Sequence, residues 1–385
     1  MAINKPLQVG FLLDTSLDPD DGVQQYILSL GAWMSRQGHN VSYLVGETKN
    51  RQAPNIYSLA RNFTVTFNGN KTTVPLPASN NKIRTFLKDH KFDVIHVQSP
   101  HSPFFSQKII KYAPKDTVII GTFHILPYGK LASNGNHLLA TALRTSLKKI
   151  DKMLAVSVSA RDFCKKSFGL EAEVLPNVID YKRFNDAAPL AKFNNQKINI
   201  LFLGRLVKRK GCQTLIRAIS LLDDGTKSKI RVIICGKGEL YEDLNKLVNS
   251  TGLEEIVTFE GYVSESDKPS YYSSADIAVF PSVSGESFGI VLLEAMASGN
   301  AAVLAGDNPG YSTVMNPKRE LLFDPKSPTE LSSLIKKYID NKTLRQEIAA
   351  WAEEYTKNFD VNIVGSKLVN IYHQEIAKKK SLKDN

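Results

Sequence analysis

Short apolar runs alternate with amphipathic segments along almost the whole chain, and this alternation limits the possible folds more than any other feature. Ten runs are typical of buried strands: LQVGFLL, NVSYLVG, FDVIHVQ, DTVIIGTFH, KMLAVS, INILFLGR, IRVIICG, VTFEGY, DIAVFPS and AAVLAG. The segments between them have the period of a helix, for example 22–37, 139–150, 213–223, 240–250 and 289–298. Such alternation predicts an α/β, doubly wound architecture, in which parallel sheets are covered by helices on both faces.

The chain is expected to contain two such sheets. Its 385 residues exceed the size of an ordinary single core, and each half of the strand series is large enough for a sheet of its own. Residues 184–197 are polar, contain proline and have no period, so we expect the break there. We therefore predict two Rossmann-like domains, at residues 1–190 and 191–362, followed by a C-terminal helix at about 363–385.

Composition indicates a reducing compartment and anionic partners. Cys164, Cys212 and Cys235 are odd in number and lack metal-ligand spacing, which disfavours disulfides and zinc. The first residues are typical of a strand rather than a signal peptide, and no apolar stretch of about 18 residues could span a membrane. The formal net charge of +11 favours nucleotides, anionic lipids or nucleic acid as partners, although solubility alone explains it equally well.

Ligands of doubly wound sheets bind beyond the carboxyl ends of the strands, and two such domains are expected to share a cleft. One candidate group follows the strand NILF: Arg205 lies at its end, and Lys208, Arg209 and Lys210 precede Gly211. Arginine can grip a diphosphate with two hydrogen bonds, and lysine adds a point charge. A solvated basic turn is the alternative interpretation.

Two glycine turns are further candidates. The turn ICGKGELYEDL, 234–244, follows a strand but lacks the full dinucleotide fingerprint, so it indicates either a turn near a nucleotide or a structural turn. Gly22 opens a helix, where the backbone can approach a ligand and N–H groups can hold phosphate. Asp20 and Asp21 would cap that helix equally well and would repel a bare phosphate, although one of them could meet an acceptor hydroxyl.

His124 is the candidate histidine, because it lies just past the buried strand DTVIIGTF. A lone histidine is more often structural, so its position at a strand end is the argument for function. His96 and His101, on either side of VQSP, are weaker candidates.

Glu286 and Glu294 are two acids in the otherwise apolar segment SGESFGIVLLEAMASG. A strand, a glycine loop and a helix that ends at Gly299 place Glu286 at the helix N-terminus and Glu294 within the helix. A glycosidase pair is one interpretation, but one acid would then lie inside a helix. Carboxylates also accept hydrogen bonds from the vicinal hydroxyls of a sugar or a ribose. Two structural acids are the third interpretation.

Together these motifs resemble the GT-B-fold retaining glycosyltransferases of the family-4 type. The resemblance is strongest in residues 198–316 and is carried by GRLVKRKG, PNVID, CGKGELYEDL, FEGYV and above all ESFGIVLLE. Within that group the sequence is similar to bacterial phosphatidyl-myo-inositol mannosyltransferases, in which the same order is found for DDGVQQYILSL, VPLP, KIRTFLKDHKFDVIHVQSP, GTFH, AVS and GESFGIVLLEAMASG.

The resemblance implies a role for each motif. Arg205 and Lys210 would bind the donor diphosphate, and His124 would line the sugar site. Glu286 would hold the hydroxyls of the transferred sugar, and Glu294 would hold the ribose. The N-terminal domain would be the acceptor side, with the C-terminal helix packed back onto it. The other donor-binding positions implied are Gly22, Gly236, Lys237, Val263, Ser287, Phe288, Gly289 and Ile290.

The resemblance also implies retention of the anomeric configuration with no metal and no other cofactor. The acceptor would attack from the leaving-group face, and the departing phosphate would take its proton. The co-substrate would be a nucleotide-sugar, with GDP-mannose favoured and a UDP-sugar as the alternative. The sequence departs from the mannosyltransferases at PDDG, VQSP and Val178, and after VPLP it lacks a longer segment that helps to receive inositol phosphate. The acceptor is therefore left open.

Residues 82–91, KIRTFLKDHK, form a short amphipathic pattern whose basic members are Lys82, Arg84, Lys88 and Lys91. A basic amphipathic helix with an aromatic residue suits an anionic bilayer surface, and a surface helix packed on the sheet is the alternative. The resemblance favours peripheral membrane association with a lipid acceptor. Nucleic acid is disfavoured as a partner, because no stacking platform or recognition motif accompanies the charge.

These features predict an enzyme that moves a hexose, with mannose favoured, from a nucleotide-sugar to a lipid-linked or glycan acceptor. We expect it in the cytoplasm, attached peripherally to the inner face of the plasma membrane. The alternatives are a glucosyl- or N-acetylglucosaminyltransferase, an epimerase or phosphorylase of the same fold, and a non-catalytic sugar-nucleotide-binding protein. The sequence does not constrain the oligomeric state.

Overall fold

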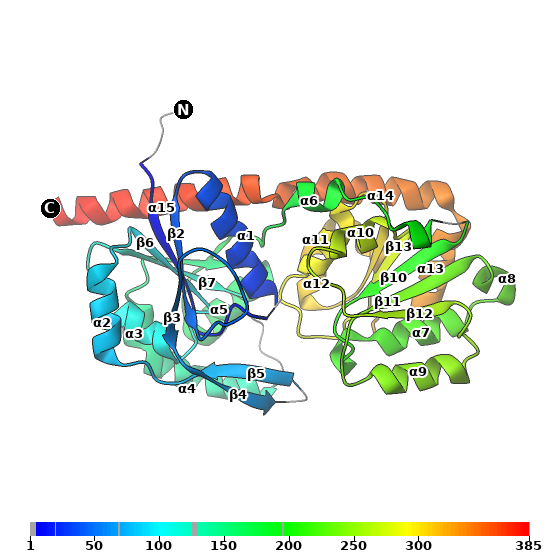
Figure 1. Ribbon diagram of the computed structural model, residues 1–385, viewed down its shortest axis with the longest axis horizontal. Coiled ribbons are helices and arrows are strands. Elements are labelled where there is room, and N and C mark those ends of the chain that lie inside the picture. Colours follow the sequence, from blue (N-terminus) through cyan, green and yellow to red (C-terminus); the bar gives the residue numbers. More distant parts are fainter. Residues whose placement is uncertain (1–4, 20, 68–69, 125–129, 195, 385) are drawn as a thin grey trace. The chain divides into compact units, whose positions relative to one another are not determined.

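The computed structural model describes residues 5–19, 21–67, 70–124, 130–194 and 196–384 (Figure 1). The chain forms two compact units: Met1–Val178 with Val361–Asn385, and Ile179–Asp360.

The first boundary differs from the predicted one at residues 190 and 191, because the polar segment 184–197 already belongs to the second unit. Helix α6 (Tyr181–Asn185) packs there against α10 (Lys268–Ser273) and buries Phe184. A polar, aperiodic stretch therefore lies at the start of the second unit and does not link the two units.

The first unit is built on a parallel seven-stranded sheet with the order β3-β2-β1-β6-β7-β8-β9. Its strands are β1 (Gln8–Leu13), β2 (Asn40–Gly46), β3 (Ile56–Ala60), β6 (Val94–Gln98), β7 (Val118–Phe123), β8 (Lys152–Ala155) and β9 (Glu173–Val174). Its helices are α1 (Gly22–Arg36), α2 (Asn80–Asp89), α3 (Phe105–Tyr112), α4 (Lys130–Leu147), α5 (Val158–Phe168) and α15 (Val361–Asp384). A separate antiparallel hairpin consists of β4 (Asn62–Phe67) and β5 (Asn70–Pro75).

The sheet of the first unit is buried on both faces, because alternate side chains of a strand point to opposite sides. Val9, Phe11 and Leu13 of β1 join the core that includes α1 and α15. Leu12 of the same strand joins the core that includes α2 and α3. The continuous apolar runs of the sequence are what a parallel sheet covered on two faces requires.

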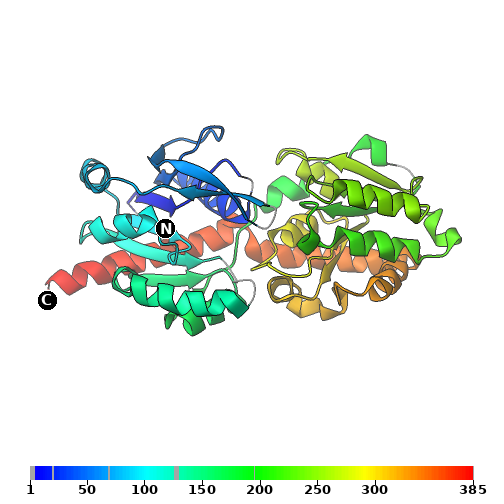
Figure 2. The ribbon, with the colours of Figure 1, turned by 90° about the horizontal axis from the view of Figure 1, so that it is seen from below.

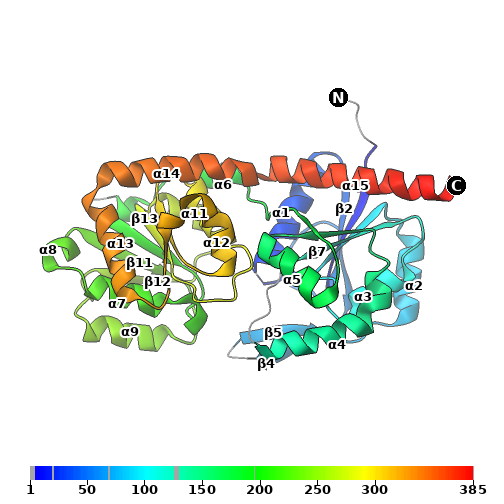
Figure 3. The same ribbon diagram turned by 180° about the vertical axis from the view of Figure 1, so that it is seen from behind.

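The C-terminal helix α15 packs on the first unit, where it lies against α1 and β7 (Figure 3). Val364, Leu368 and Tyr372, spaced by four residues, form its buried apolar stripe. Nearer the end of the helix, Lys379 Nζ donates hydrogen bonds to Asp151 Oδ2 and to a backbone carbonyl oxygen, both at 2.7 Å. Helix α15 thus contributes to the same hydrophobic core as β1.

The second unit contains a parallel six-stranded sheet with the order β12-β11-β10-β13-β14-β15 and helices on both faces (Figure 2). Its strands are β10 (Ile198–Leu203), β11 (Ile230–Cys235), β12 (Val257–Gly261), β13 (Ile277–Phe280), β14 (Ala302–Gly306) and β15 (Leu322–Phe323). Its further α-helices are α7 (Cys212–Ser220), α8 (Asp224–Lys227), α9 (Tyr241–Ser250), α11 (Ile290–Ala297), α12 (Pro309–Met315), α13 (Pro328–Asp340) and α14 (Lys342–Thr356). Short 3₁₀ segments are η1 (Ala191–Phe193), η2 (Lys208–Lys210), η3 (Asn316–Leu321) and η4 (Lys357–Phe359).

Both main sheets are parallel, and both are doubly wound, so the predicted fold class is confirmed. Within the described part of the chain, no helix combines the length and the apolar character needed to cross a membrane.

Gly365→Val is expected to destabilise the first unit. Gly365 lies on α15 against the buried indole of Trp33, and a Cβ at this position would come within 2.6 Å of Trp33 Cε3. Trp33 Nε1 donates to Asn362 Oδ1 at 2.8 Å, so a displaced indole would also lose a hydrogen bond. We expect the free energy of unfolding, measured by urea denaturation, to fall by about 1–3 kcal/mol.

Lys367→Val, at an exposed position on the same helix, is the matched control and should change the stability little. Equal stability of Gly365→Val and the parent protein would contradict the close packing of α15 on Trp33.

Candidate functional site

The carboxyl ends of three neighbouring strands in the second unit carry the candidate residues. β10 leads into η2, β11 into the turn at Gly236, and β13 into the loop before α11. The N–H of Val283 donates to the carbonyl oxygen of Arg209 at 2.8 Å, which holds the β13 loop against η2. Gly236 has a φ of +142°, and a Cβ there would lie 1.9 Å from the carbonyl oxygen of Gly204. The close approach of the β10 and β11 turns therefore requires glycine.

Glu286, in the loop after β13, lies among three hydrogen-bond donors. Its Oε1 accepts from Lys210 Nζ at 2.8 Å, from Arg209 Nη1 at 2.9 Å and from Ser282 Oγ at 3.0 Å. The side chains of Glu286 and Lys210 are only 13% and 14% exposed. Burial raises the pKa of the Glu286 carboxyl, but the Lys210 and Arg209 cations outweigh it, and the pKa lies below its ordinary value. The group is therefore a buried, ionised carboxylate.

The structure selects among the basic residues of the run 205–210. Lys210, a predicted phosphate ligand, contacts Glu286, and so does Arg209, which the sequence singled out only as a member of the run. The side chains of Arg205 and Lys208 are exposed. No sequence signal distinguished Arg209 from Lys208, because only the conformation of η2 decides which neighbour turns inward.

Helix α11 begins at Ile290, and its N-cap residue, Gly289, has no side chain that could cap it. Gly289 has a φ of +108°, and a Cβ there would lie 2.6 Å from the ring of Tyr311. The N–H groups of an uncapped first turn need other partners, as they do at anion-binding helix N-termini. Phe288 is buried against Phe359, with ring centroids 5.9 Å apart. The remaining predicted positions of this segment, Ser287 and Ile290, are half-buried.

Glu294, the second acid, is buried on α11 with 3% of its surface exposed. Its Oε2 accepts a hydrogen bond from the Tyr272 hydroxyl at 2.9 Å, and its Oε1 lies 3.9 Å from Lys268 Nζ. Burial and the nearby Glu294 charge raise the pKa of Tyr272 well above its ordinary value, so the phenol remains a donor. The two acids thus have different surroundings, and contact of Glu294 with a ribose stays a prediction.

The turn after β11 brings Lys237 close to an aromatic residue. Lys237 Nζ lies 6.0 Å from the ring centroid of Tyr262, whose side chain is 57% exposed at the end of β12. Val263, the predicted donor-binding neighbour, is buried. Tyr262 was not among the predicted site residues. The one feature of the sequence that could have indicated it is its place as an aromatic residue just after a strand.

In the first unit, His124 follows β7 and faces Gln98 at the end of β6. His124 Nε2 lies 2.7 Å from Gln98 Oε1, and the imidazole is 4% exposed. Burial lowers the pKa of His124 to about 3, so the ring is neutral near physiological pH. His124 therefore cannot supply positive charge to a phosphate.

The two weaker histidine candidates are packed within the first unit. Both ring nitrogens of His96 have hydroxyl partners, the Tyr372 hydroxyl at 2.7 Å and Thr122 Oγ1 at 2.6 Å. His101 stacks on Phe123 with ring centroids 5.0 Å apart. The two hydroxyls account for both ring nitrogens of His96, whereas Nδ1 of His101 is buried and has no hydrogen-bond partner among the described residues.

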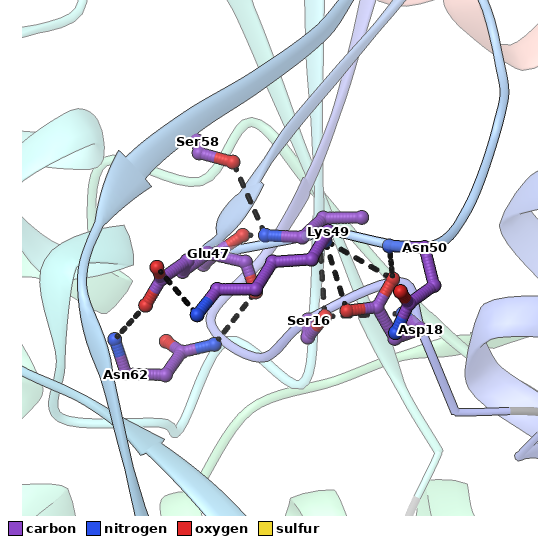
Figure 4. A network of polar contacts seen from close by, with 9 residues as sticks. Ser16, Asp18, Glu47, Lys49, Asn50, Ser58 and Asn62 are labelled. Carbon is purple, nitrogen blue, oxygen red and sulfur yellow. Dashed lines mark hydrogen bonds and ion pairs between the residues drawn. The ribbon is translucent and has the colours of Figure 1, made fainter.

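Gly22 opens α1, and the loop before it is anchored by Asp18 (Figure 4). The Asp18 carboxylate accepts hydrogen bonds from the N–H groups of residues 49–51 at 3.0, 2.8 and 2.9 Å. Burial raises the pKa of Asp18, but these hydrogen bonds have the larger combined effect, so the pKa lies below its ordinary value. The side chain of Asp21 makes no capping hydrogen bond to α1, and Asp20 lies outside the described residues.

Helix α2 exposes its basic and other polar side chains to solvent, and the acid Asp89 is exposed with them. Its apolar side chains, Ile83, Phe86 and Leu87, are buried in the core of the first unit. The helix thus packs on the sheet as a surface helix, and membrane contact through it would be electrostatic. The predicted membrane-surface residues, all exposed, are Lys82, Arg84, Lys88 and Lys91.

The three cysteines, Cys164, Cys212 and Cys235, are buried and form no disulfide. Among the residues that the structure describes, no cluster of three or more His, Cys, Asp or Glu side chains is arranged to hold a metal ion.

Two doubly wound parallel units in one chain are the architecture of the GT-B fold. Residues 21–183 match the family described as Glycosyltransferase Family 4, and residues 185–355 match Glycosyl transferases group 1. The chain belongs to the glycosyltransferases composed of these two domains, and the resemblance found in its motifs is confirmed.

Similar proteins extend over nearly the full chain. Phosphatidyl-myo-inositol mannosyltransferase from Mycobacterium tuberculosis (strain H37Rv) is 29% identical over 375 residues, which are 95% of this chain and 96% of that protein. Sucrose-phosphate synthase from Thermosynechococcus elongatus has a TM-score of 0.73 at 18% identity, covering 96% of this chain and 99% of its own. HepE from Anabaena, in complex with UDP, has a TM-score of 0.69 at 16% identity and covers 96% and 100%.

The Glu286 cluster is expected to make the second unit sensitive to acid. The pKa of Glu286 in the folded chain lies below its ordinary value of 4.5. Its stabilisation is therefore complete above about pH 4.5 and is lost as the pH falls through the folded pKa. Urea denaturation at about pH 7 and about pH 3.5 measures the loss. A Trp33→Phe background leaves Trp351 in α14 as the single tryptophan, which reports on the second unit.

Glu286→Gln has no carboxyl to protonate, so it should lose less stability over this range than the parent protein. Glu320→Gln is the matched control, since that side chain lies on η3 and is 51% exposed. An acid-induced loss in Glu286→Gln as large as that of the parent would contradict the linkage to this group.

Proposed function

We propose that this protein is a retaining, metal-independent hexosyltransferase that moves mannose from GDP-mannose to a lipid-linked or glycan acceptor. The observation that carries the proposal is Glu286, held at Oε1 by Lys210 and Arg209. A carboxylate is suited to the hydroxyls of a sugar, and cations are suited to a diphosphate. Similarity to phosphatidyl-myo-inositol mannosyltransferases supports mannose as the sugar.

The donor diphosphate would share the cations that now neutralise Glu286. Lys210 and Arg209 lie at the strand end where the first-turn N–H groups of α11 are also uncapped. Negative charge grows on the diphosphate as the glycosidic bond breaks, and preorganised cations and amides stabilise that charge. Arg205 would add a further contact from the end of β10.

Glu286 would accept hydrogen bonds from hydroxyls of the transferred sugar, which fixes the ring beside the cations. The acceptor hydroxyl would attack from the face that the diphosphate leaves, and the departing phosphate oxygen would take its proton. This route retains the anomeric configuration and requires no side chain as general base. His124 and Gly22 are the residues of the first unit proposed to contact sugar and phosphate.

The nucleoside part of the donor would bind at the ends of β11, β12 and α11. Glu294 would accept from the ribose hydroxyls, and the backbone around Gly236, Lys237 and Val263 would contact the base. Backbone contacts discriminate weakly between bases, so a UDP-sugar is the alternative donor. UDP is the nucleotide bound to the structurally similar HepE.

Glu286→Gln is expected to lower the kcat of donor hydrolysis or sugar transfer by about 100-fold, because an interaction with the reacting sugar is removed. Lys210→Met should have a comparable effect on kcat/KM through the diphosphate. Lys208→Met, which changes an exposed cation in the same turn, is the matched control and should keep nearly full activity. Full turnover by Glu286→Gln would refute its assigned role.

A thermal-shift series with GDP-mannose, UDP-glucose and UDP-N-acetylglucosamine is expected to give the largest shift with GDP-mannose. The nucleotide-sugar that gives the largest shift is then the donor to use in the activity test. Binding of a nucleotide-sugar without turnover, whichever acceptor is added, would favour a sugar-nucleotide-binding protein over an enzyme.

We further propose that the acceptor side binds the inner face of the plasma membrane through the basic residues of segment 82–91. The full chain should sediment with anionic vesicles more than with neutral ones, and added salt should weaken this binding. Changing Lys82, Arg84, Lys88 and Lys91 to glutamine should reduce it. The charge-matched control changes four exposed lysines of the second unit: Lys229, Lys246, Lys326 and Lys342. Equal binding to neutral vesicles would contradict the electrostatic account.

A further inference from the structure

The end of β6 and the end of β7 place two polar side chains on one face of the first sheet. The strands pair in parallel, with Gln98 opposite Thr122. Because alternate residues of a strand share a face, His124 lies on the same side as Gln98. Gln98 is 1% exposed and His124 is 4% exposed, so each must find its hydrogen-bond partners within the protein or a ligand.

The side-chain amide of Gln98 can have only one orientation. Gln98 Nε2 lies 3.1 Å from the backbone carbonyl oxygen of His96, which can only accept a hydrogen bond. The NH₂ group must therefore face that carbonyl, and Oε1 must face His124 Nε2 at 2.7 Å. Exchanging the two ends of the amide would bring two acceptor oxygens together in a buried place, which is costly.

The orientation of Gln98 determines the tautomer of His124. Gln98 Oε1 accepts only, so His124 Nε2 must carry the proton that is donated. Burial lowers the pKa of His124 to about 3, and a neutral imidazole has a single N–H. Nδ1 is then an acceptor. The edge-on contact with the buried ring of Tyr26, with centroids 5.0 Å apart, also limits rotation of the imidazole.

We propose that Gln98 is a positioning residue, which fixes His124 as the Nε2–H tautomer so that Nδ1 accepts a hydrogen bond from a hydroxyl of the donor sugar. The ligand chemistry follows from the tautomer: an acceptor nitrogen binds a hydroxyl and disfavours a carboxylate or phosphate oxygen. The sugar contact rests on the proposed function, whereas the tautomer does not.

Nuclear magnetic resonance tests the tautomer without any substrate. Long-range ¹H–¹⁵N correlation of the full chain labelled in its seven histidines distinguishes a protonated Nε2 from a protonated Nδ1, and His124→Gln identifies the signals of His124. We expect the Nε2–H pattern in the parent protein. Gln98→Met should lose this preference.

Gln107→Met is the matched control. Gln107 is a neighbouring glutamine whose Nε2 donates to the carbonyl oxygens of Pro100 and Ser102, at 2.9 and 2.6 Å. Its replacement should leave the His124 signals unchanged. A protonated Nδ1 in the parent protein, or an unchanged pattern in Gln98→Met, overturns the proposal. If Gln98→Met does not fold, the parent spectrum alone decides.

Kinetics test the contact with the sugar. We expect Gln98→Met to lower kcat/KM for the donor about tenfold, the effect of one hydrogen bond. A changed tautomer with unchanged kcat/KM would overturn the sugar contact. A parent protein with the expected tautomer but no turnover of any donor would refute the proposed function and leave the role of Gln98 towards His124 standing.

Discussion

The ion pairing of one buried carboxylate governs the arrangement of the second unit at its strand ends. Glu286 would be costly at 13% exposure without partners, and Lys210 and Arg209 provide them. The acid belongs to the loop after β13 and the cations belong to the turn after β10. Moving either loop would separate the Glu286 carboxylate from its cations and leave the largely buried acid without compensation. The pairing therefore holds two loops together, and it keeps an acid and two cations side by side, as the proposed binding of a sugar diphosphate requires.

The helix that follows the acid loop gives this arrangement a rigid support. The side chains of α11 are buried on almost all sides, including Leu292, Leu293 and Met296. A helix buried all round cannot slide or rotate without opening cavities, so its N-terminus stays fixed relative to β13. Gly289 permits the abrupt entry into this helix, because its backbone conformation and the nearby Tyr311 ring exclude a side chain. The apolar helix around Glu294 thus fixes the position of the loop that precedes it and carries Glu286.

The sequence was sufficient for the fold and for part of the site, and the difference has a physical cause. Alternation of apolar runs and helix periods predicted both sheets, because a parallel sheet covered on two faces requires that pattern. Glu286 and Lys210 were singled out through the motif resemblance, and the structure brings their side chains into contact. Arg209 was not separated from Lys208, because that choice depends on the turn conformation of η2. The anchoring of Asp18 by residues 49–51 was missed, because it joins two loops whose meeting no local pattern encodes.

The two histidines of the first sheet, His96 and His124, differ in whether their buried hydrogen-bond partners determine the tautomer of the ring. His96 meets two hydroxyls, from Tyr372 and Thr122, and a hydroxyl rotates to donate or accept as required. Either tautomer of His96 is therefore satisfied, and both its nitrogens are occupied by the protein. Gln98 is different, because a backbone carbonyl fixes its amide and leaves it able only to accept from His124. A neutral amide thus imposes a direction on one imidazole without placing a charge in the core, where desolvation would make that charge costly.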